Sequence, residues 1–285
     1  MEIRFWGVRG SIATSGPATA EVGGNTSCVE VRCGDSVLIL DAGTGLRALG
    51  VDLMRRGAGR GGVEAHLLLS HFHWDHIQGF PFFGPAYVPG NRVSIYGAPL
   101  GGKPVHEAFA AQMRPPHFPV DMSAMRAALD FRDVAPGEAL PVGEARVRTA
   151  VGRHPDGCLV WRVEHGGAAV VYATDTEHDG DTGEIDGGLL DLARGADLLI
   201  YDAQYTADEY CSKRGWGHST AEEGIRLAEA AGVRQLVLFH HDPGHDDAEV
   251  ERIEAAARAR FAGAIAAREG LELVLKPRVP GRLAA

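Results

Sequence analysis

Five apolar segments in this chain of 285 residues each lead, within two positions, into an aspartate or a histidine, a pattern that constrains the fold more than any other. They cover residues 36–40, 65–69, 168–173, 197–201 and 235–239. Their length and apolar character predict buried β-strands. In mixed α/β folds the loops at strand ends carry the chemistry, while the sheet holds them rigid. We therefore expect a layered α/β fold with one site assembled along one edge of a sheet.

The rest of the chain is predicted to alternate between strands and helices. Further strands are expected over residues 2–6, 27–33, 93–96, 145–151 and 158–165. Helices are expected from after Gly43 to about Arg56, over 219–231 and over about 246–262. The second of these begins with Ser219 or Thr220 as N-cap and carries a glutamate three positions later, the pattern of a capping box. Because no repeat or long polar linker divides the sequence, a single domain is expected over residues 1–285.

Charge and cysteine content restrict the partners of the chain. Lys and Arg number 28 against 38 Asp and Glu, a formal net charge of −10, which disfavours broad contact with nucleic-acid phosphates. The four cysteines, Cys28, Cys33, Cys158 and Cys211, form no CxxC pair and are expected to be free thiols in a reducing compartment. No apolar run approaches the roughly 18 residues that span a bilayer, and residues 1–7 lack the order of a signal peptide. We therefore expect a cytoplasmic protein without membrane contact.

The segment His71-Phe72-His73-Trp74-Asp75-His76 carries three imidazoles and a carboxylate in six residues, after a predicted strand and before a predicted helix. Imidazole and carboxylate are ligands that suit Zn, Mn or Fe. In an extended segment alternate side chains point the same way, so His71 and His73 can share one metal ion. Asp75 and His76 lie past the turn and are expected to face a second ion.

This segment resembles the HxHxDH signature of the metallo-β-lactamase superfamily. The family requires a third histidine, a bridging aspartate and a last histidine farther along, which His154, Asp175 and His240 match in the expected order. Asp41, in Leu-Asp-Ala-Gly, matches a buried aspartate that braces the family's metal site. The resemblance covers residues 3 to about 245. His241 is a rival for the last position, and His240 is preferred because it directly follows an apolar strand.

The resemblance implies an αβ/βα four-layer sandwich, with two mixed β-sheets flanked by helices and two divalent metal ions at the sheet edge. It assigns His71, His73 and His154 to one ion, with Asp175 as the bridge. Asp75, His76 and His240 are assigned to the other ion. Zinc is the first expectation, with Mn or Fe as alternatives. Position 73 is histidine where the diiron oxidoreductase branch carries a carboxylate, which favours hydrolysis over redox chemistry.

The block Gly217-His218-Ser219-Thr220-Ala221 and the strand that follows resemble the tRNA 3′-processing endonucleases (the RNase Z group) and related phosphodiesterases. The resemblance implies that His218 is the general acid for the leaving group. Asp202 stands where that group has a glutamate that orients the histidine, and its reach is shorter. In such enzymes a metal-bridged hydroxide attacks the phosphodiester. His218, Asp202 and the metal ligand Asp75 are thus the candidate catalytic residues.

Two further segments are expected near the site. The turn that contains Asn25, Thr26 and Ser27 resembles a small polar loop of the same group and is expected to contact a phosphate, or else to be a plain strand-entry turn. Residues 115–119, Pro-Pro-His-Phe-Pro, are expected in a loop over the pocket.

The expected substrate is a small phosphodiester, with a cyclic nucleotide as one guess. The tRNA enzymes grip their substrate with a long basic arm, and neither such an insertion nor a basic charge balance is found in this sequence. Extended nucleic acid is therefore not the expected partner. The alternatives are endoribonuclease activity on tRNA, a metal-dependent thioesterase or lactonase of the same fold, and a non-catalytic metal-binding protein. Related enzymes often form homodimers, so a homodimer is also expected.

Overall fold

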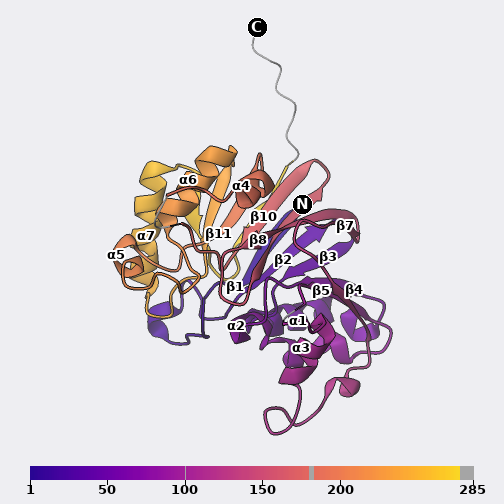
Figure 1. Ribbon diagram of the computed structural model, residues 1–285. Coiled ribbons are helices and arrows are strands. Elements are labelled where there is room, and N and C mark those ends of the chain that lie inside the picture. Colours follow the sequence, from indigo (N-terminus) through magenta and orange to yellow (C-terminus); the bar gives the residue numbers. More distant parts are fainter. Residues whose placement is uncertain (100, 180–182, 277–285) are drawn as a thin grey trace.

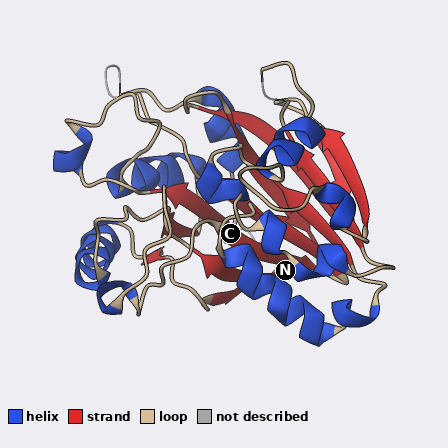
Figure 2. Ribbon diagram, turned by 90° about the horizontal axis from the view of Figure 1, so that it is seen from below, coloured by secondary structure: helices blue, strands red, loops and turns tan. Residues whose placement is uncertain are grey.

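Two seven-stranded β-sheets packed face to face form the centre of the structure, and helices cover the outer face of each (Figure 1, Figure 2). This computed structural model describes residues 1–99, 101–179 and 183–276. The layer order of helix, sheet, sheet and helix confirms the expected αβ/βα sandwich with two mixed sheets. Among the described helices, none combines the length and apolar character needed to cross a bilayer.

The first sheet takes most of its strands from the N-terminal half of the chain. Its order is β14 (Glu272–Val274), β1 (Glu2–Gly7), β2 (Cys28–Cys33), β3 (Ser36–Leu40), β4 (Glu64–Leu68), β5 (Arg92–Gly97) and β6 (Ala128–Asp133). Strands β3 to β6 are mutually parallel, whereas β14, β1, β2 and β3 pair antiparallel. The helices on its outer face are α1 (Gly45–Arg56), α2 (Trp74–Ile77) and α3 (Val105–Gln112) (Figure 1).

The second sheet takes its strands from the C-terminal half. Its order is β13 (Ala264–Ala266), β12 (Gln235–Phe239), β11 (Leu198–Asp202), β10 (Ala168–Ala173), β9 (Cys158–His165), β8 (Ala145–Gly152) and β7 (Ala139–Val142). Strands β10 to β13 are parallel, and β7 to β10 pair antiparallel. Its outer helices are α4 (Gly187–Ala193), α5 (Ala207–Tyr210), α6 (Ala221–Ala231) and α7 (Asp247–Arg260). Short 3-10 helices cover Pro17–Thr19, Ala58–Arg60, Phe80–Phe82, Gly84–Tyr87 and Met122–Ala124.

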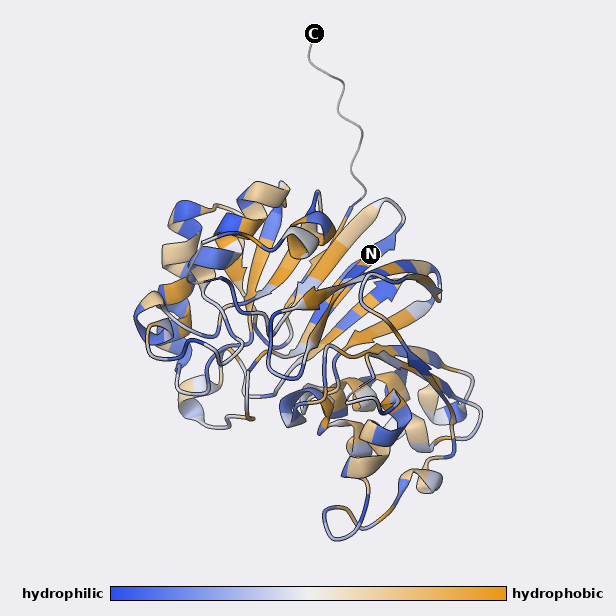
Figure 3. Ribbon diagram, in the orientation of Figure 1, coloured by the Kyte–Doolittle hydropathy of each residue, from blue (hydrophilic) through white to orange (hydrophobic). Residues whose placement is uncertain are grey.

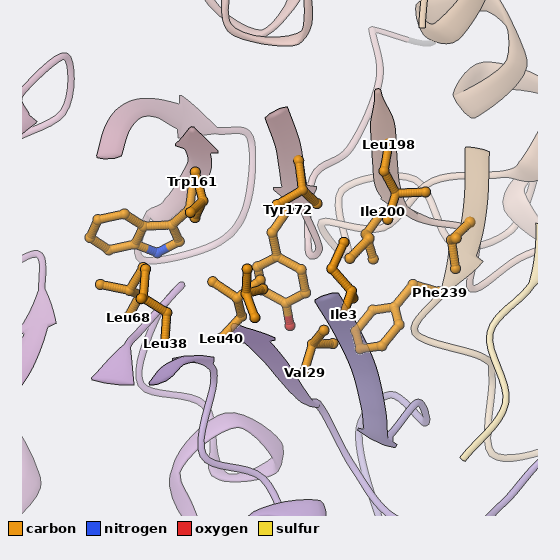
Figure 4. Packing of buried hydrophobic residues seen from close by; sticks show 14 of the residues in the cluster. Ile3, Val29, Leu38, Leu40, Leu68, Trp161, Tyr172, Leu198, Ile200 and Phe239 are labelled. Atoms are coloured by element: carbon orange, nitrogen blue, oxygen red, sulfur yellow. The ribbon is translucent and has the colours of Figure 1, made fainter. Parts of the chain in front are cut away.

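The apolar strands are buried on both faces, which explains why their sequences do not alternate between apolar and polar residues. In β3, Leu38 and Leu40 face the second sheet, while Val37 and Ile39 face α1. Figure 4 shows the inter-sheet core, where Trp161 and Tyr172 pack against side chains of the first sheet. Figure 3 shows the same pattern as orange strands under helices with blue outer positions.

The predicted elements are found with boundaries shifted by one or two residues, and one expectation needs correction. The five strand ends that carry Asp or His belong to two sheets rather than one, because β3 and β4 lie in the first and β10, β11 and β12 in the second. Helix α6 takes Thr220 rather than Ser219 as its N-cap, and the Thr220 side chain accepts from the Glu223 amide. The four cysteines are free thiols, three buried and one exposed.

Candidate metal centre

Three histidines lie together beyond the ends of β4 and β8. Ligand nitrogens of His71, His73 and His154 all lie within 4.8 Å of one another, and we call these residues the first cluster. His73 Nδ1 is 3.1 Å from His154 Nε2, and the ring centroids of His71 and His73 are 4.4 Å apart. His71 is buried and His73 is exposed, so the first cluster reaches from the interior to solvent.

Four buried residues form a second cluster beside the first: Asp75, His76, Asp175 and His240. His76 Nε2 lies 3.0 Å from Asp75 Oδ2 and 3.2 Å from His240 Nε2. Asp75 and His76 lie on α2, whereas Asp175 and His240 follow β10 and β12. The second cluster is therefore assembled from both sheets, as is the first.

Asp175 lies between the clusters and turns one carboxylate oxygen toward each. Its Oδ2 is 3.2 Å from His76 Nε2 and 3.3 Å from His240 Nε2. Its Oδ1 is 3.7 Å from His71 Nε2 and 3.8 Å from His154 Nε2. This is the position that the sequence predicts for the bridging aspartate.

Hydrogen bonds around the clusters fix which imidazole nitrogens face inward. In four histidines Nδ1 donates to an oxygen outside the clusters, so Nδ1 carries the proton and Nε2 presents a lone pair. The acceptors are the Ser70 hydroxyl for His71 (3.0 Å), Asp41 for His76 (2.7 Å), the Gly217 carbonyl for His154 (2.9 Å) and the Gln204 side-chain oxygen for His240 (2.9 Å).

This arrangement fits divalent cations. The Nε2 atoms of His76 and His240 face each other at 3.2 Å, and two lone pairs repel unless a cation or a proton lies between them. Among the described residues, His71 Nε2 is buried and has no hydrogen-bond partner, which a metal ion would provide. Inward imidazole nitrogens together with carboxylates are a donor set for Zn, Mn or Fe.

The charged groups of the centre also favour the binding of a cation. Burial disfavours the charged form of His76, but Asp175, Asp75 and Asp41 outweigh it and raise the pKa of His76 well above its usual range. By contrast, burial and the neighbouring His76 lower the pKa of His71 well below normal. Burial opposes ionisation of Asp175 as well, yet the charges of His240 and His76 lower its pKa well below normal. A divalent cation would therefore compete with protons here, and its affinity would rise with pH.

Asp41 braces the centre from behind, as the resemblance implies. Its Oδ1 accepts from the Ser70 amide at 2.7 Å, and its Oδ2 accepts from the Ser70 hydroxyl at 2.7 Å, Tyr172 Oη at 2.8 Å and His76 Nδ1 at 2.7 Å. The residue is fully buried and has a positive φ of 61°. These bonds hold the ring of His76 in one orientation.

The structure distinguishes His240 from its rival, His241. His240 Nε2 points into the second cluster, 3.2 Å from Asp75 Oδ2. His241 points away and donates from Nε2 to the Ala267 carbonyl at 2.9 Å. Burial lowers the pKa of His241 to about 3, so this imidazole is neutral and links the segment after β12 to the segment after β13.

His218 lies at the edge of both clusters and is held by Asp202. His218 Nδ1 donates to Asp202 Oδ2 at 2.9 Å and lies 3.8 Å from Asp175 Oδ1. The Asp202 carboxylate also accepts from the backbone amides of Asp175 and Ser219, which fixes its position. Burial would lower the pKa of His218, but the charge and hydrogen bond of Asp202 prevail and raise it to about 9. The short aspartate side chain therefore reaches the histidine.

Three contributors escape prediction from the sequence. The Ser11 amide donates to Asp75 Oδ2 at 2.8 Å, and Gln204 orients His240. Glu177 accepts from the amides of Gly215 and Gly217 at 2.7 and 2.9 Å and so holds the loop before His218. The sequence around these residues gives only a weak indication of their roles. Ser11 lies in a glycine-containing loop, and Glu177 and Gln204 lie two residues after Asp175 and Asp202.

The turn at residues 25–27, expected either to contact a phosphate or to be a plain strand-entry turn, is largely buried in the structure. Thr26 and Ser27 are fully buried, and Thr26 exchanges two hydrogen bonds with Thr44. The side chain and amide of Asn25 donate to Glu269. The polar groups of Asn25 and Thr26 thus tie the start of β2 to its neighbours, which favours the plain strand-entry turn, and phosphate contact stays a prediction. His117 and Phe118, from the predicted loop at 115–119, line a cavity that also includes Trp74.

We expect Gly10→Ala to weaken metal binding at the second cluster by about 10- to 100-fold, the effect of disturbing a group that orients a ligand. A Cβ atom at position 10 would lie 2.5 Å from the His240 ring and 2.8 Å from the oxygen of Gln204. Competition with a chromophoric chelator measures the affinity. Gly187→Ala is the matched control because no atom lies within 4 Å of its added Cβ. Equal affinities for the two variants would contradict the proposed ligand role of His240.

Comparison with known proteins places this geometry in context. Residues 37–241 match the family model described as Beta-lactamase superfamily domain. An uncharacterized protein of Mycobacterium leprae is 30% identical over 246 residues, which cover 80% of this chain and 74% of that protein. A ribonuclease Z of Myxococcus xanthus is 25% identical over 279 residues, which cover 85% of this chain and 89% of the relative.

Solved structures share the fold. The metallo-beta-lactamase fold protein YhfI of Bacillus subtilis superimposes with a TM-score of 0.72 at 22% identity, covering 95% of this chain and 98% of that one. The short form of human tRNase Z gives a TM-score of 0.67 at 19% identity, with coverages of 97% and 100%. At these identities the likeness concerns the arrangement of the sheets and helices.

Proposed function

This chain belongs to the beta-lactamase superfamily, and from that premise we propose that it is a metal-dependent hydrolase of small phosphodiesters that uses two divalent ions. The observation that carries the proposal is the position of His218, which is held by Asp202 and lies 3.8 Å from the carboxylate of Asp175 between the clusters. A site for hydrolysis of an ester with a poor leaving group needs such a proton donor beside the ions.

The proposed ligands are His71, His73 and His154 for one ion and Asp75, His76 and His240 for the other, with Asp175 shared. Zinc is the proposed metal, and Mn and Fe are alternatives. When bound, two divalent ions supply positive charge for the phosphate oxygens and make water more acidic.

His218 has the proton that a departing alkoxide needs. Its Nδ1 donates to Asp202, so in the protonated ring Nε2 is free to donate to the leaving oxygen. As the oxygen leaves, it takes this proton and departs as an alcohol, and the neutral imidazole then regains a proton from water. Asp202 orients the ring, and its charge keeps the ring protonated at neutral pH.

Two observations support a small substrate. The net charge of −10 opposes a long polyanion. Between His154 and Asp175 the chain forms the β9–β10 hairpin, whose strands join through Gly166 and Gly167, so this part of the chain contains no long basic arm of the kind that grips tRNA.

The second candidate, an endoribonuclease, is favoured by the ribonuclease Z relative at 25% identity. A cytoplasmic location and a homodimer stay predictions.

A substrate panel tests the proposal. The purified protein, loaded with Zn or Mn, is offered bis(p-nitrophenyl) phosphate, 3′,5′-cyclic nucleotides, a tRNA precursor, a thioester, a lactone and a β-lactam. We expect turnover of the small phosphodiesters, which is lost on dialysis against a chelator and restored by metal. Turnover of the lactone or thioester alone would contradict the proposal. Cleavage of the tRNA precursor at concentrations that leave the cyclic nucleotides intact would establish the endoribonuclease instead.

A further inference from the structure

A cavity of about 930 Å³ lies beside the candidate metal centre, between α2 and its following 3-10 helix on one side and α3 with its following loop on the other. We call it the aromatic groove. Its lining includes four aromatic side chains and two cationic ones: Phe72, Trp74, Phe82, Phe118, Lys103 and Arg114. Its volume is in the range of small-molecule sites.

The aromatic groove borders the segment that carries four of the proposed ligands. Phe72 and Trp74 line the groove, and Trp74 lies in the sequence between the proposed ligands His73 and Asp75. Asp75 is buried, whereas 78% of Trp74 is exposed to solvent. A molecule held against Trp74 is therefore beside the segment that would hold the metal ions.

Two aromatic side chains of the groove, Trp74 and Phe82, are largely exposed to solvent. Phe82 is 59% exposed, although its ring makes an edge contact with Phe118 at 5.7 Å between centroids. Isolated exposed apolar side chains are common, but two large rings in one groove mark a binding surface. Flat aromatic faces bind planar rings by stacking.

The two cationic side chains of the aromatic groove are also accessible to a ligand. Lys103 is one of only three lysines in a chain of net charge −10, and Lys103 and Arg114 are both exposed. Glu107 also lines the groove, but within the described ranges neither cation forms an ion pair with this or any other carboxylate. Lysine and arginine side chains are hydrogen-bond donors, so beside aromatic faces they complement a planar ring that bears carbonyl oxygens, whereas an alkyl group would leave both donors unused.

We propose that the aromatic groove binds the base of a nucleoside phosphodiester, with the ring stacked on Trp74 and with Lys103 and Arg114 donating to the carbonyl oxygens of the ring. This inference rests on the proposed function and names the substrate class of the same site. Trp74 is thereby a specificity-determining residue rather than a catalytic one.

Two diesters with the same leaving group test the proposal. Thymidine 5′-(p-nitrophenyl phosphate) carries a base, and methyl p-nitrophenyl phosphate does not. We expect the ratio of their kcat/KM values to fall about 10-fold or more in Trp74→Ala, the size of one stacking contact, and to be largely kept in Trp74→Phe. Arg114→Ala is expected to lower the same ratio, whereas Arg55→Ala, an exposed arginine of α1, is the matched control.

A binding measurement separates this inference from the proposed function. Thymidine 5′-phosphate is added to the metal-free protein while tryptophan fluorescence is recorded, with ribose 5-phosphate as the ligand that lacks a base. We expect quenching by the nucleotide only, and its loss in Trp74→Phe. Quenching without turnover of any diester would uphold the aromatic groove and overturn the proposed function.

Two outcomes would overturn the aromatic groove instead. In the first, both diesters are hydrolysed at a ratio that Trp74→Ala does not change, which leaves the proposed function standing. In the second, the shielding of Trp74 from solvent increases with protein concentration rather than with nucleotide concentration. The groove would then be an interface with a second copy of this chain.

Discussion

Asp175→Asn is expected to lower kcat/KM for bis(p-nitrophenyl) phosphate by about 10³-fold, because loss of metal-supplied charge costs several kcal/mol in the transition state. The substitution keeps the shape of the side chain and removes its charge. Each carboxylate oxygen faces two imidazole nitrogens, at 3.2 and 3.3 Å for Oδ2 and at 3.7 and 3.8 Å for Oδ1. An amide has one oxygen and one NH₂ group, so it turns a donor toward one of the two clusters.

The same variant is expected to hold fewer than two metal ions per chain, as measured by elemental analysis after gel filtration. Asp191→Asn is the matched control, because that aspartate is exposed on α4 and, within the part of the chain that the structure describes, pairs only with Arg194. A circular dichroism spectrum shows whether the variant is folded. Two tightly held ions together with an unchanged rate would refute the bridging role of Asp175.

His218→Ala is expected to slow hydrolysis of a 3′,5′-cyclic nucleotide by about 10²- to 10⁴-fold, the usual contribution of a general acid. The alkoxide that leaves a cyclic nucleotide needs a proton, whereas p-nitrophenolate leaves without one. The loss should therefore be much smaller with bis(p-nitrophenyl) phosphate. His165→Ala, at the end of β9, is the matched control. Equal losses on both substrates would remove the general-acid role and leave only a structural one.

The pH profile provides an independent readout of the same residue. A general acid works in its protonated form, so kcat for the cyclic nucleotide should fall as the pH rises through the pKa of His218. Asp202 raises that pKa against the effect of burial. Asp202→Asn should consequently move the descending limb to lower pH, and His218→Ala should abolish it. A limb that stays in place in both variants would assign it to another group.

The sequence predicts most of the candidate centre because its geometry is local or follows from strand order. His71, His73, Asp75 and His76 lie in six consecutive residues, so one strand end and one helical turn place them all. His154, Asp175 and His240 follow strands of the second sheet that end at the same edge. There Asp175 and His240 have positive φ values of 50° and 62°. A residue at such a position can be recognised from an apolar run that stops at Asp or His.

What the sequence does not reveal depends on contacts between segments that are distant in the chain. Ser11 reaches Asp75 across 64 positions, and Glu177 holds a loop about 40 residues away. The turn at residues 25–27 is polar in sequence, yet packing against Thr44 buries Thr26. Strand β6 escapes prediction because its residues are exposed or half-buried, which leaves no continuous apolar run.

Each cluster draws ligands from both halves of the sandwich: His71, His73, Asp75 and His76 follow the first sheet, and His154, Asp175 and His240 follow the second. A bound ion would therefore act as a reversible cross-link between the two halves. Since the unfolded chain cannot reproduce this donor set, metal binding would contribute directly to the free energy of unfolding. When metal is scarce, the chain would then lose its activity and would also unfold more often and be degraded. The amount of protein would therefore depend on the metal supply.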